Sequence, residues 1–367
     1  MHDTQLNDLC GKTVLVTGGG GLIGSRIAAH LRRLGARPLS LCALDAYPRQ
    51  TYRDLFGVDA AHPDVIVGNV QNPSLVKKAV AESDYVIHAA ALADVAACTR
   101  KPMGAIHTNI TGTQVVLDAV AACERTRRMV FVSSASVYGN GNPDDWAGPR
   151  DEHRTMRQLL ESVYGRTPPQ FREEAQLHPM SVYGNTKAWG ETQTALTLGP
   201  VGTSYTVVRY FSVYGEPQVI KENSHSWVVD WFANRASLGL PLHLNGGGNQ
   251  IRDLVHVDDI AEATVRSLVA PRAHNETINV GSGTPTSIRA VAELVAEQYP
   301  GTRFMETPLP PGDPMGGYAA TTRMESVLGW RPGITVKQGV VRYANWLAKH
   351  RDAVPAWLRA ESEPSAA

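Results

Sequence analysis

The chain has 367 residues, 43% hydrophobic and 19% charged, which is ordinary for a globular protein with room for a large domain and a smaller second lobe. Lysine plus arginine number 35 and aspartate plus glutamate also number 35, so no bulk charge attracts nucleic acid or an anionic membrane. The four cysteines are scattered without a CxxC pair, which favours free thiols over a disulfide framework or a zinc site.

The N-terminal segment MHDTQLNDLCGK has no apolar signal core. No run in the chain approaches the roughly 18 apolar residues of a membrane span. We therefore expect a cytoplasmic protein with neither a nucleic acid nor a membrane as partner.

The first part of the chain alternates short apolar runs with helical patterns. The apolar runs are continuous, as expected for strands that are buried on both faces. Strand, helix and strand at this spacing predict an α/β fold, a Rossmann-type doubly wound parallel sheet with helices on both faces. The alternation covers Thr13–Thr17, Ile23–Leu34, Pro38–Leu44, Ser74–Ala81, Tyr85–Ala91, Asn109–Cys123 and Met129–Ser133.

A glycine-rich turn follows the first predicted strand, in TVLVTGGGGLIGSRIAAHL. Gly18, Gly21 and Gly24 give the spacing GxxGxxG, which lets the backbone approach a pyrophosphate at a helix N-terminus. A purely structural glycine turn is the alternative, but the position directly after a strand favours a nucleotide site.

Asp45 ends the next predicted strand, 21 residues beyond Gly24. A carboxylate there accepts hydrogen bonds from ribose hydroxyls and repels a 2′-phosphate, which favours NAD over NADP. Arg49 and Arg53 leave NADP open, and a surface-loop aspartate is the alternative interpretation of Asp45.

The alternation of apolar runs and helical patterns stops between Gly139 and Pro179, after a serine cluster at Ser133–Ser136. GNGNPDDWAGPR is rich in turn residues, MRQLLESVYG has a short helical pattern, and TPP ends it. The segment is interpreted as an inserted excursion between the serine cluster and the next helix.

Tyr183 and Lys187 lie four residues apart, so on a helix they project from one face. There the ammonium is expected to hold down the pKa of the phenol and make Tyr183 a proton acceptor. Tyr-x-x-x-Lys alone is a weak signal and often a solvated helix face. With the glycine turn and the serine cluster, in this order, it predicts a nicotinamide-dependent enzyme acting on a sugar alcohol.

The later part is less regular. It contains a strand at Thr206–Phe211, Gly- and Pro-rich joints at 239–249 and 308–317, and a helix at Val336–Lys349. Residues from 352 onward are expected to form a frayed tail. We expect an NAD-binding Rossmann domain over 1–210, with 254–282 returning to it, a smaller substrate-binding lobe over 211–350, and the tail over 351–367.

Ten motifs spread over residues 12–345 together resemble the extended short-chain dehydrogenase/reductases. The closest pattern is the NAD-dependent nucleotide-sugar epimerase/dehydratase family, in particular members similar to UDP-glucose/UDP-galactose 4-epimerase. The motifs are TGGGGLIG (17–24), GNVQN (68–72), HAAA (88–91), NITGT (109–113), VSSASVYG (132–139), PMSVYGNTK (179–187), VRYFSVYG (208–215), IRDLVHVDD (251–259), NVGSG (279–283) and LGWRP (328–332).

The resemblance implies roles for particular residues. Tyr183 is the acid/base, Lys187 lowers its pKa and holds the nicotinamide ribose, and Ser134 hydrogen-bonds the reacting hydroxyl. Ser133 and Ser136 are expected to pack or cap. The implied contacts to NAD are Gly18, Gly21, Leu22, Ile23, Gly24, Asp45, Asn69, Val70, Ala89, Ala90, Ala91, Asn109, Tyr183, Lys187 and Tyr210, with Asn69 near adenine and Asn109 bracing the active-site backbone. The implied contacts to a nucleotide-diphosphate sugar are Ser134, Ser136, Tyr183, Ser212 and Arg252.

The residues after Ser134 help to choose among the family's reactions. The 4,6-dehydratases carry an acidic pair there and the sugar-acid decarboxylases a glutamate, whereas this chain has Ala135 and Ser136. The pattern favours a C4 epimerase over a dehydratase. A one-way 4-ketoreductase or dehydrogenase is the nearest alternative. A non-catalytic NAD-sensing protein is disfavoured because Tyr183 and Lys187 are both present.

The sugar is expected to differ from plain UDP-glucose, for example a modified, amino or acidic sugar. Ser212, Pro310 and Ala320 replace the family's asparagine, arginine and aspartate, whereas Arg252 is retained as the expected pyrophosphate ligand. By the same resemblance, Gly317 lies near the position where a small residue admits bulkier sugars in epimerases of this kind.

Other features have plainer interpretations. His88 and His256 lack a second ligand at metal spacing, so we expect core or strand-end histidines and no metal. Trp227 and Trp231 are expected to pack a helix. By resemblance, the Asn109–Cys123 helix and the Tyr183 helix pair with their copies in a homodimer.

Overall fold

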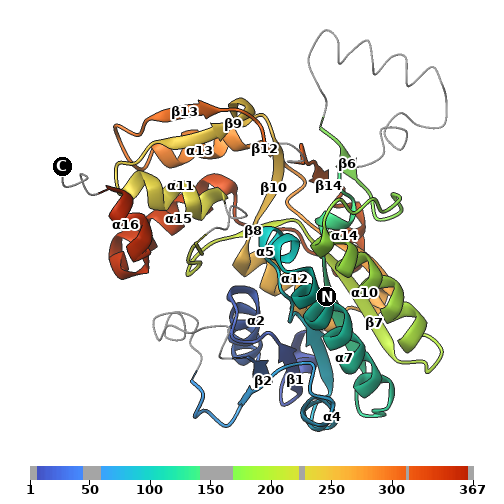
Figure 1. Cartoon of the computed structure of the whole chain (residues 1–367). Coiled ribbons are helices and arrows are strands. Elements are labelled where there is room, and N and C mark those ends of the chain that lie inside the picture. The colour runs from blue at the N-terminus through green and yellow to red at the C-terminus, as the bar shows by residue number, and fades with distance from the viewer. Residues whose placement is uncertain (1–5, 44–58, 141–167, 223–227, 311–313, 363–367) are drawn as a thin grey trace, which may run out of the picture.

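The computed structural model describes residues 6–43, 59–140, 168–222, 228–310 and 314–362. The excursion at 140–170 and Trp227 therefore lie largely or wholly outside the described residues. Figure 1 shows a large sheet domain with a second lobe packed beside it.

The central sheet is parallel throughout and has seven strands. This confirms the predicted Rossmann-type α/β fold. The strand order is β11 (Glu276–Val280), β7 (Ser204–Tyr210), β5 (Arg128–Ser134), β4 (Tyr85–His88), β1 (Thr13–Thr17), β2 (Arg37–Cys42) and β3 (Val65–Val67).

Helices cover both faces of this sheet, which explains why its strands are apolar at successive positions. In β1, Val14 and Val16 pack in one core cluster while Leu15 between them packs in another, and none of the three is exposed. α2 (Leu22–Arg33) and α12 (Val257–Val269) contact each other, as do α4 (Pro73–Ala81) and α7 (Gly112–Ala121). α10 (Val182–Leu198) packs beside α7 (Figure 1).

The predicted elements in the first part of the chain are present, with two differences. The predicted strand Tyr85–Ala91 ends at His88, and Ala89–Ala91 form a turn. The predicted helix Asn109–Cys123 is preceded and partly replaced by a π-helical turn, Ile106–Thr111, which follows α5 (Val95–Arg100) and α6 (Pro102–Ala105).

The second lobe has its own buried core. Its strands are β8 (Ser212–Tyr214), β10 (Ile251–His256) and β12 (Pro285–Ser287) in one sheet, and β9 (Leu242–Asn245) with β13 (Phe304–Thr307) in another. Its helices include α11 (Val228–Ser237), α13 (Ile288–Ala296) and α15 (Val336–Lys349). β6 (Gln170–Phe171) pairs with β14 (Tyr318–Ala319), and α14 (Thr322–Leu328) follows. The domain limits at 210 and 350 stay a prediction.

The expectation of a frayed tail from residue 352 is wrong for residues up to 362. α16 (Ala356–Ser362) packs on the second lobe, with Leu358 fully buried. Trp357 stacks on Trp231 at 6.2 Å between ring centroids, which also gives Trp231 the expected packing role. The apolar side chains of this segment cover the lobe's core, and that burial outweighs the cost of ordering the backbone.

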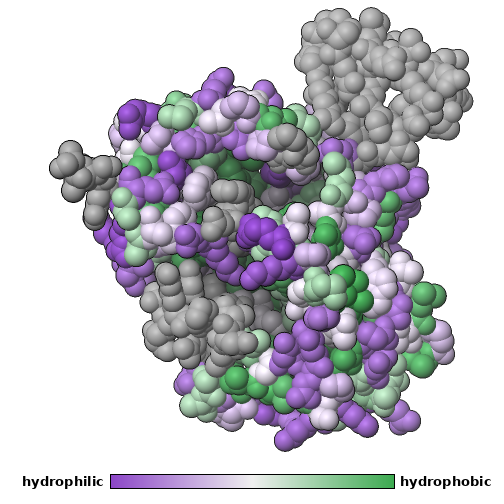
Figure 2. Space-filling model, in the orientation of Figure 1, coloured by the Kyte–Doolittle hydropathy of each residue, from purple (hydrophilic) through white to green (hydrophobic). Residues whose placement is uncertain are grey.

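The surface of the described residues is mixed. Figure 2 shows hydrophilic residues spread over the visible face, with hydrophobic residues scattered between them. Within the described ranges, no helix combines the length and apolarity needed to cross a membrane.

Candidate active site

The glycine turn joins β1 to α2 and is closely packed. Gly18 has φ +72°, and a Cβ there would lie 2.9 Å from Cα of Ala90. A Cβ at Gly24 would lie 2.2 Å from the carbonyl oxygen of Gly18. Gly21 caps α2 without a side-chain acceptor, and the first turn, which begins at Leu22 and Ile23, has no acidic residue. The first amide groups of the helix are therefore available to an anion.

The ends of neighbouring strands meet at this turn, because the carboxyl ends of parallel strands share one edge. The amides of Ala89 and Ala90 donate to Thr17, at 3.3 Å to its carbonyl oxygen and 3.2 Å to its hydroxyl, and Ala91 follows in the same turn. Asn69 is exposed after β3, and its Oδ1 accepts from the amide of Gln71 at 2.9 Å.

Val70 and Asp45 are two further expected NAD contacts. Val70 is buried, and a Cβ at Gly112 would lie 2.7 Å from its Cγ2, so its side chain packs against α7. Asp45 lies outside the described residues, so its role at the ribose stays a prediction.

Small residues bring α10 against β5. Ser181 caps the helix by accepting from the amide of Gly184 at 3.0 Å. A Cβ at Gly184 would lie 2.6 Å from the carbonyl oxygen of Ser136, and one at Gly190 would lie 2.3 Å from the Phe131 ring. This close approach places the helix face that carries Tyr183 beside the end of β5.

Tyr183 forms a hydrogen bond with Ser134. Burial raises the pKa of the Tyr183 phenol to about 12, and the bond with Ser134 only partly opposes this effect. Desolvation is therefore the largest influence on the phenol. The Lys187 ammonium lies 5.9 Å from the centre of the Tyr183 ring, and its expected lowering of the Tyr183 pKa stays a prediction.

Lys187 is buried, and its Nζ donates to the carbonyl oxygen of Val132 at 2.8 Å. Burial lowers the pKa of Lys187 to about 8, and Glu191 is the main group that opposes this shift. The lysine is thus a desolvated cation beneath Tyr183, fixed to the strand that carries Ser134.

Asn109 braces the backbone around the site, as its position in the sequence suggested. Its Oδ1 accepts from the amide of Leu92 at 2.7 Å, and its Nδ2 donates to the carbonyl oxygen of Leu92 at 3.1 Å. The same Nδ2 donates to the hydroxyl of Thr186 at 3.0 Å. These bonds tie the turn after β4 to α10.

Tyr210 is packed in the core, and its expected contact with NAD stays a prediction. Its side chain is buried, and its hydroxyl lies 2.5 Å from the hydroxyl of Thr264 on α12. The phenol is therefore held in the core on the α12 side. Burial raises the pKa of this phenol.

The expected substrate contacts divide into two groups. Ser136 lies beside Ser134, whose hydroxyl accepts from the Ser136 amide at 3.2 Å, and the Ser136 hydroxyl is buried without a partner among the described residues. Ser212 begins β8, and Arg252 lies on the adjacent strand β10. Nη1 of Arg252 donates to the carbonyl oxygens of Ile251 at 2.8 Å and Pro314 at 3.1 Å.

Gly317 has a packing role that its sequence position did not indicate. A Cβ there would lie 2.5 Å from the carbonyl oxygen of Pro169 and 2.7 Å from the ring of Phe171. The small residue is thus needed where β6 meets β14.

His88 is a core histidine, as expected. Its nitrogens lie 2.7 Å from the hydroxyl of Thr17 and 2.9 Å from that of Thr113. Burial, helped by the charge of Lys187, lowers the pKa of His88 to about 3, so the ring is neutral.

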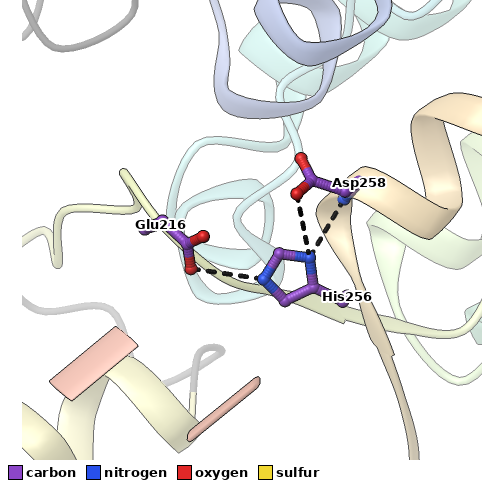
Figure 3. A group of neighbouring side chains, drawn as sticks. All are labelled: Glu216, His256 and Asp258. Carbon is purple, nitrogen blue, oxygen red and sulfur yellow. Dashed lines mark hydrogen bonds and ion pairs between the residues drawn. The ribbon is translucent and has the colours of Figure 1, made fainter. Parts of the chain in front are cut away.

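His256 has neighbours that sequence spacing did not reveal, Glu216 and Asp258 (Figure 3). Its Nδ1 accepts from the amide of Asp258 at 3.2 Å, so the ring hydrogen lies on Nε2, which donates to Glu216 at 3.2 Å. Arg342 pairs with both carboxylates at 2.6 Å, which makes the cluster an ion-pair network.

A buried polar network behind β5 was also missed by the sequence reasoning. Glu191 accepts from Ser133 at 2.5 Å and from Nη2 of Arg209 at 2.6 Å. Nη1 of Arg209 donates to the hydroxyl of Tyr138, which donates to Asn279. The one available signal was that Glu191 lies one helical turn beyond Lys187, on the same face.

Comparison with known proteins gives a consistent family. The family described as "NAD dependent epimerase/dehydratase" matches residues 14–158 and 161–281. A dTDP-L-rhamnose 4-epimerase of Burkholderia thailandensis is 27% identical over 366 residues, covering 96% of this chain and 99% of the relative. A dTDP-glucose 4,6-dehydratase of Streptomyces antibioticus is 28% identical over 349 residues, covering 92% and 93%.

A solved structure agrees with this. The UDP-glucose 4-epimerase of Thermus thermophilus, in complex with NAD, superposes with a TM-score of 0.75 at 26% identity, covering 92% of this chain and 99% of that one. The described residues fit NAD, because the glycine turn leaves no room for side chains and the amides at the start of α2 have no side-chain acceptor. NAD is the cofactor, and the chain belongs to the NAD-dependent epimerase/dehydratase family of nucleotide-sugar enzymes.

Proposed function

We propose that this chain is an NAD-dependent epimerase of a nucleotide-diphosphate sugar that inverts C4 through a transient 4-keto intermediate. The observation that carries the proposal is the hydrogen-bonded pair of Ser134 and Tyr183, with the buried Lys187 beneath it.

In the proposed reaction Tyr183 accepts the proton of the sugar hydroxyl, and Ser134 holds that hydroxyl in line. NAD, when bound, would supply the hydride acceptor, and its positive charge would favour the phenolate. Lys187 adds a second positive charge in a site of low dielectric, where charge is most effective. Together these charges must offset the burial that raises the pKa of Tyr183 to about 12. The bound cofactor would give the hydride back to the opposite face of the C4 carbonyl carbon while Tyr183 returns its proton to the C4 oxygen, which completes the inversion.

Epimerisation is favoured over dehydration by the turn after Ser134. Ala135 and Ser136 occupy the short helical turn there, and neither carries a carboxyl group. Eliminating water from the sugar needs an acid that protonates the leaving hydroxide. The Ser136 hydroxyl, buried without a partner among the described residues, is better suited to hold a sugar oxygen.

The proposed substrate is a nucleotide-diphosphate sugar other than plain UDP-glucose. Ser212 offers a short hydroxyl where a longer amide is usual, and Arg252 is the proposed pyrophosphate ligand, with its guanidinium oriented by two backbone carbonyls.

The proposed oligomer is a homodimer through α7 and α10, which lie side by side; Leu196 on α10 is 64% exposed. The cytoplasm is the proposed location.

The test is to incubate the purified protein with a panel of nucleotide-diphosphate sugars and to identify the products by NMR. Interconversion of C4 epimers without added cofactor supports the proposal. A 4-keto-6-deoxy product would show a dehydratase instead. Net consumption of added NADH would show a reductase.

A further inference from the structure

Glu191 occupies a central position behind the catalytic groups. It lies on α10 one turn beyond Lys187, and only 8% of its side chain is exposed. Its carboxylate accepts four hydrogen bonds, one from Ser133 and three from Arg209. These four hydrogen bonds compensate the buried carboxylate for its lost hydration.

Glu191 and Lys187 both bind β5, at successive residues of that strand. Lys187 binds the carbonyl oxygen of Val132, and Glu191 binds the side chain of Ser133, the next residue of β5. The residue after that is Ser134. The two bonds therefore fix the register between α10, which carries Tyr183, and the end of β5.

We propose that Glu191 is a positioning residue that keeps Lys187 charged and holds Ser134 in line with Tyr183. The proposal rests on the function proposed above. It gives the buried pair of Glu191 and Arg209 a role in the proton transfer at Tyr183, through Lys187 and Ser133, without contact with the substrate.

The electrostatics agree with this geometry. Burial lowers the pKa of Lys187 to about 8, and the charge of Glu191 is the largest influence in the opposite direction. Lys187 is also faced by Tyr183 from its own helix, by Cys98 from α5 and by the neutral His88 from β4. Arg209 from β7 pairs with Glu191 at 2.6 Å. Among these groups Glu191 has the largest stabilising effect on the ammonium, and Cys98 adds to it.

The test measures the titration of Lys187 directly, by NMR of protein carrying lysine labelled with ¹³C at the ε carbon. Lys187→Arg assigns the signal. In Glu191→Gln the midpoint of the Lys187 titration is expected to move down by roughly one pH unit, because the neutral amide no longer stabilises the ammonium.

Glu191→Gln leaves Arg209 without a counter-charge and can lower stability. The double variant Glu191→Gln/Arg209→Met removes that unpaired cation and is expected to keep the downward shift. Asp118→Asn is the matched control, since it removes an exposed carboxylate from the neighbouring helix α7. Its Lys187 midpoint should equal that of the unmodified protein.

A second measurement, the kcat of a Ser133 variant, separates the effect of Glu191 on the register of α10 and β5 from its effect on the charge of Lys187. Ser133→Ala removes one bond to Glu191 and no charge, so kcat on an accepted nucleotide-diphosphate sugar should fall about tenfold with an unchanged Lys187 midpoint. A folded double variant whose Lys187 titrates as in the unmodified protein would overturn the inference. If instead the unmodified protein epimerises no sugar while the titration shifts as expected, the proposed function fails and the role of Glu191 in setting the charge of Lys187 stands.

Discussion

Tyr183 shows why two residues at the right spacing do not by themselves define an acid/base. The phenol loses its hydration on folding, and this raises its pKa to about 12 despite the bond with Ser134. Lys187 loses its hydration too, and its pKa falls to about 8. The raised pKa of Tyr183 disfavours its phenolate form, and the lowered pKa of Lys187 disfavours its ammonium form. The protein's own groups therefore leave the phenol neutral at pH 7.

The pKa of Lys187 leads to a prediction about how turnover depends on pH. Lys187 contributes its charge fully below its pKa of about 8 and loses it as the pH rises above that value. We expect kcat/KM to fall on the alkaline side of about pH 8, and Lys187→Arg to move that decline upward. The measurement is a pH–rate profile of both proteins, and a flat profile to pH 10 would contradict the role of Lys187.

Removing the phenol oxygen of Tyr183 is expected to lower the reaction rate without loss of bound NAD. Tyr183→Phe should lower kcat by about 10² to 10⁴-fold, the range typical for loss of a general acid–base group. NAD content, measured by its absorbance after denaturation, should stay unchanged. Tyr205→Phe, a tyrosine of β7, is the control and should retain activity. Loss of NAD from Tyr183→Phe would assign that residue a structural role.

At the scale of elements, the site depends on how closely α10 lies on β5. A Cβ at Gly190 would lie 2.3 Å from the Phe131 ring, so Gly190→Ala must push the helix or the ring aside. We expect a loss of about 1–3 kcal/mol in the free energy of unfolding, typical of an overpacked core. Gly104→Ala in α6 is the matched control, because its nearest neighbour lies at 4.0 Å. Thermal and urea unfolding measure both, and equal stabilities would contradict this packing.

Elements were predictable where one physical cause dominates. Continuous apolar runs such as Thr13–Thr17 indicate strands buried on both faces, and β1 has those bounds. The π-helical turn at Ile106–Thr111 was not predictable, because it depends on Asn109 reaching Leu92 and Thr186, 17 and 77 residues away in sequence.

The features of the candidate site also divide into those that local sequence predicts and those that depend on contacts between distant segments. The glycine turn and the Tyr183 helix are local in sequence and were predicted. The pairing of Glu191 with Arg209 and of Glu216 with His256 arises from segments joined only by folding. The raised pKa of Tyr183 depends on burial, which the spacing to Lys187 does not report.

At the scale of the whole molecule, the second lobe is completed by the last described helix. Leu358 is fully buried there, so Leu358→Ala should lower the free energy of unfolding by about 2–5 kcal/mol. Val201→Ala, at a residue that is 53% exposed, is the control and should change little. Thermal unfolding is the measurement, and a melting temperature unchanged by Leu358→Ala would contradict the packing of α16.

The ion-pair network at Glu216 also acts on the whole molecule. Arg26 on α2 donates to the carbonyl oxygen of Glu216 at 2.7 Å, while Arg342 on α15 binds the carboxylates of Glu216 and Asp258. These bonds therefore link α2 of the sheet domain to α15 of the second lobe. Because salt screens partly exposed ion pairs, we expect a higher ionic strength to weaken this link.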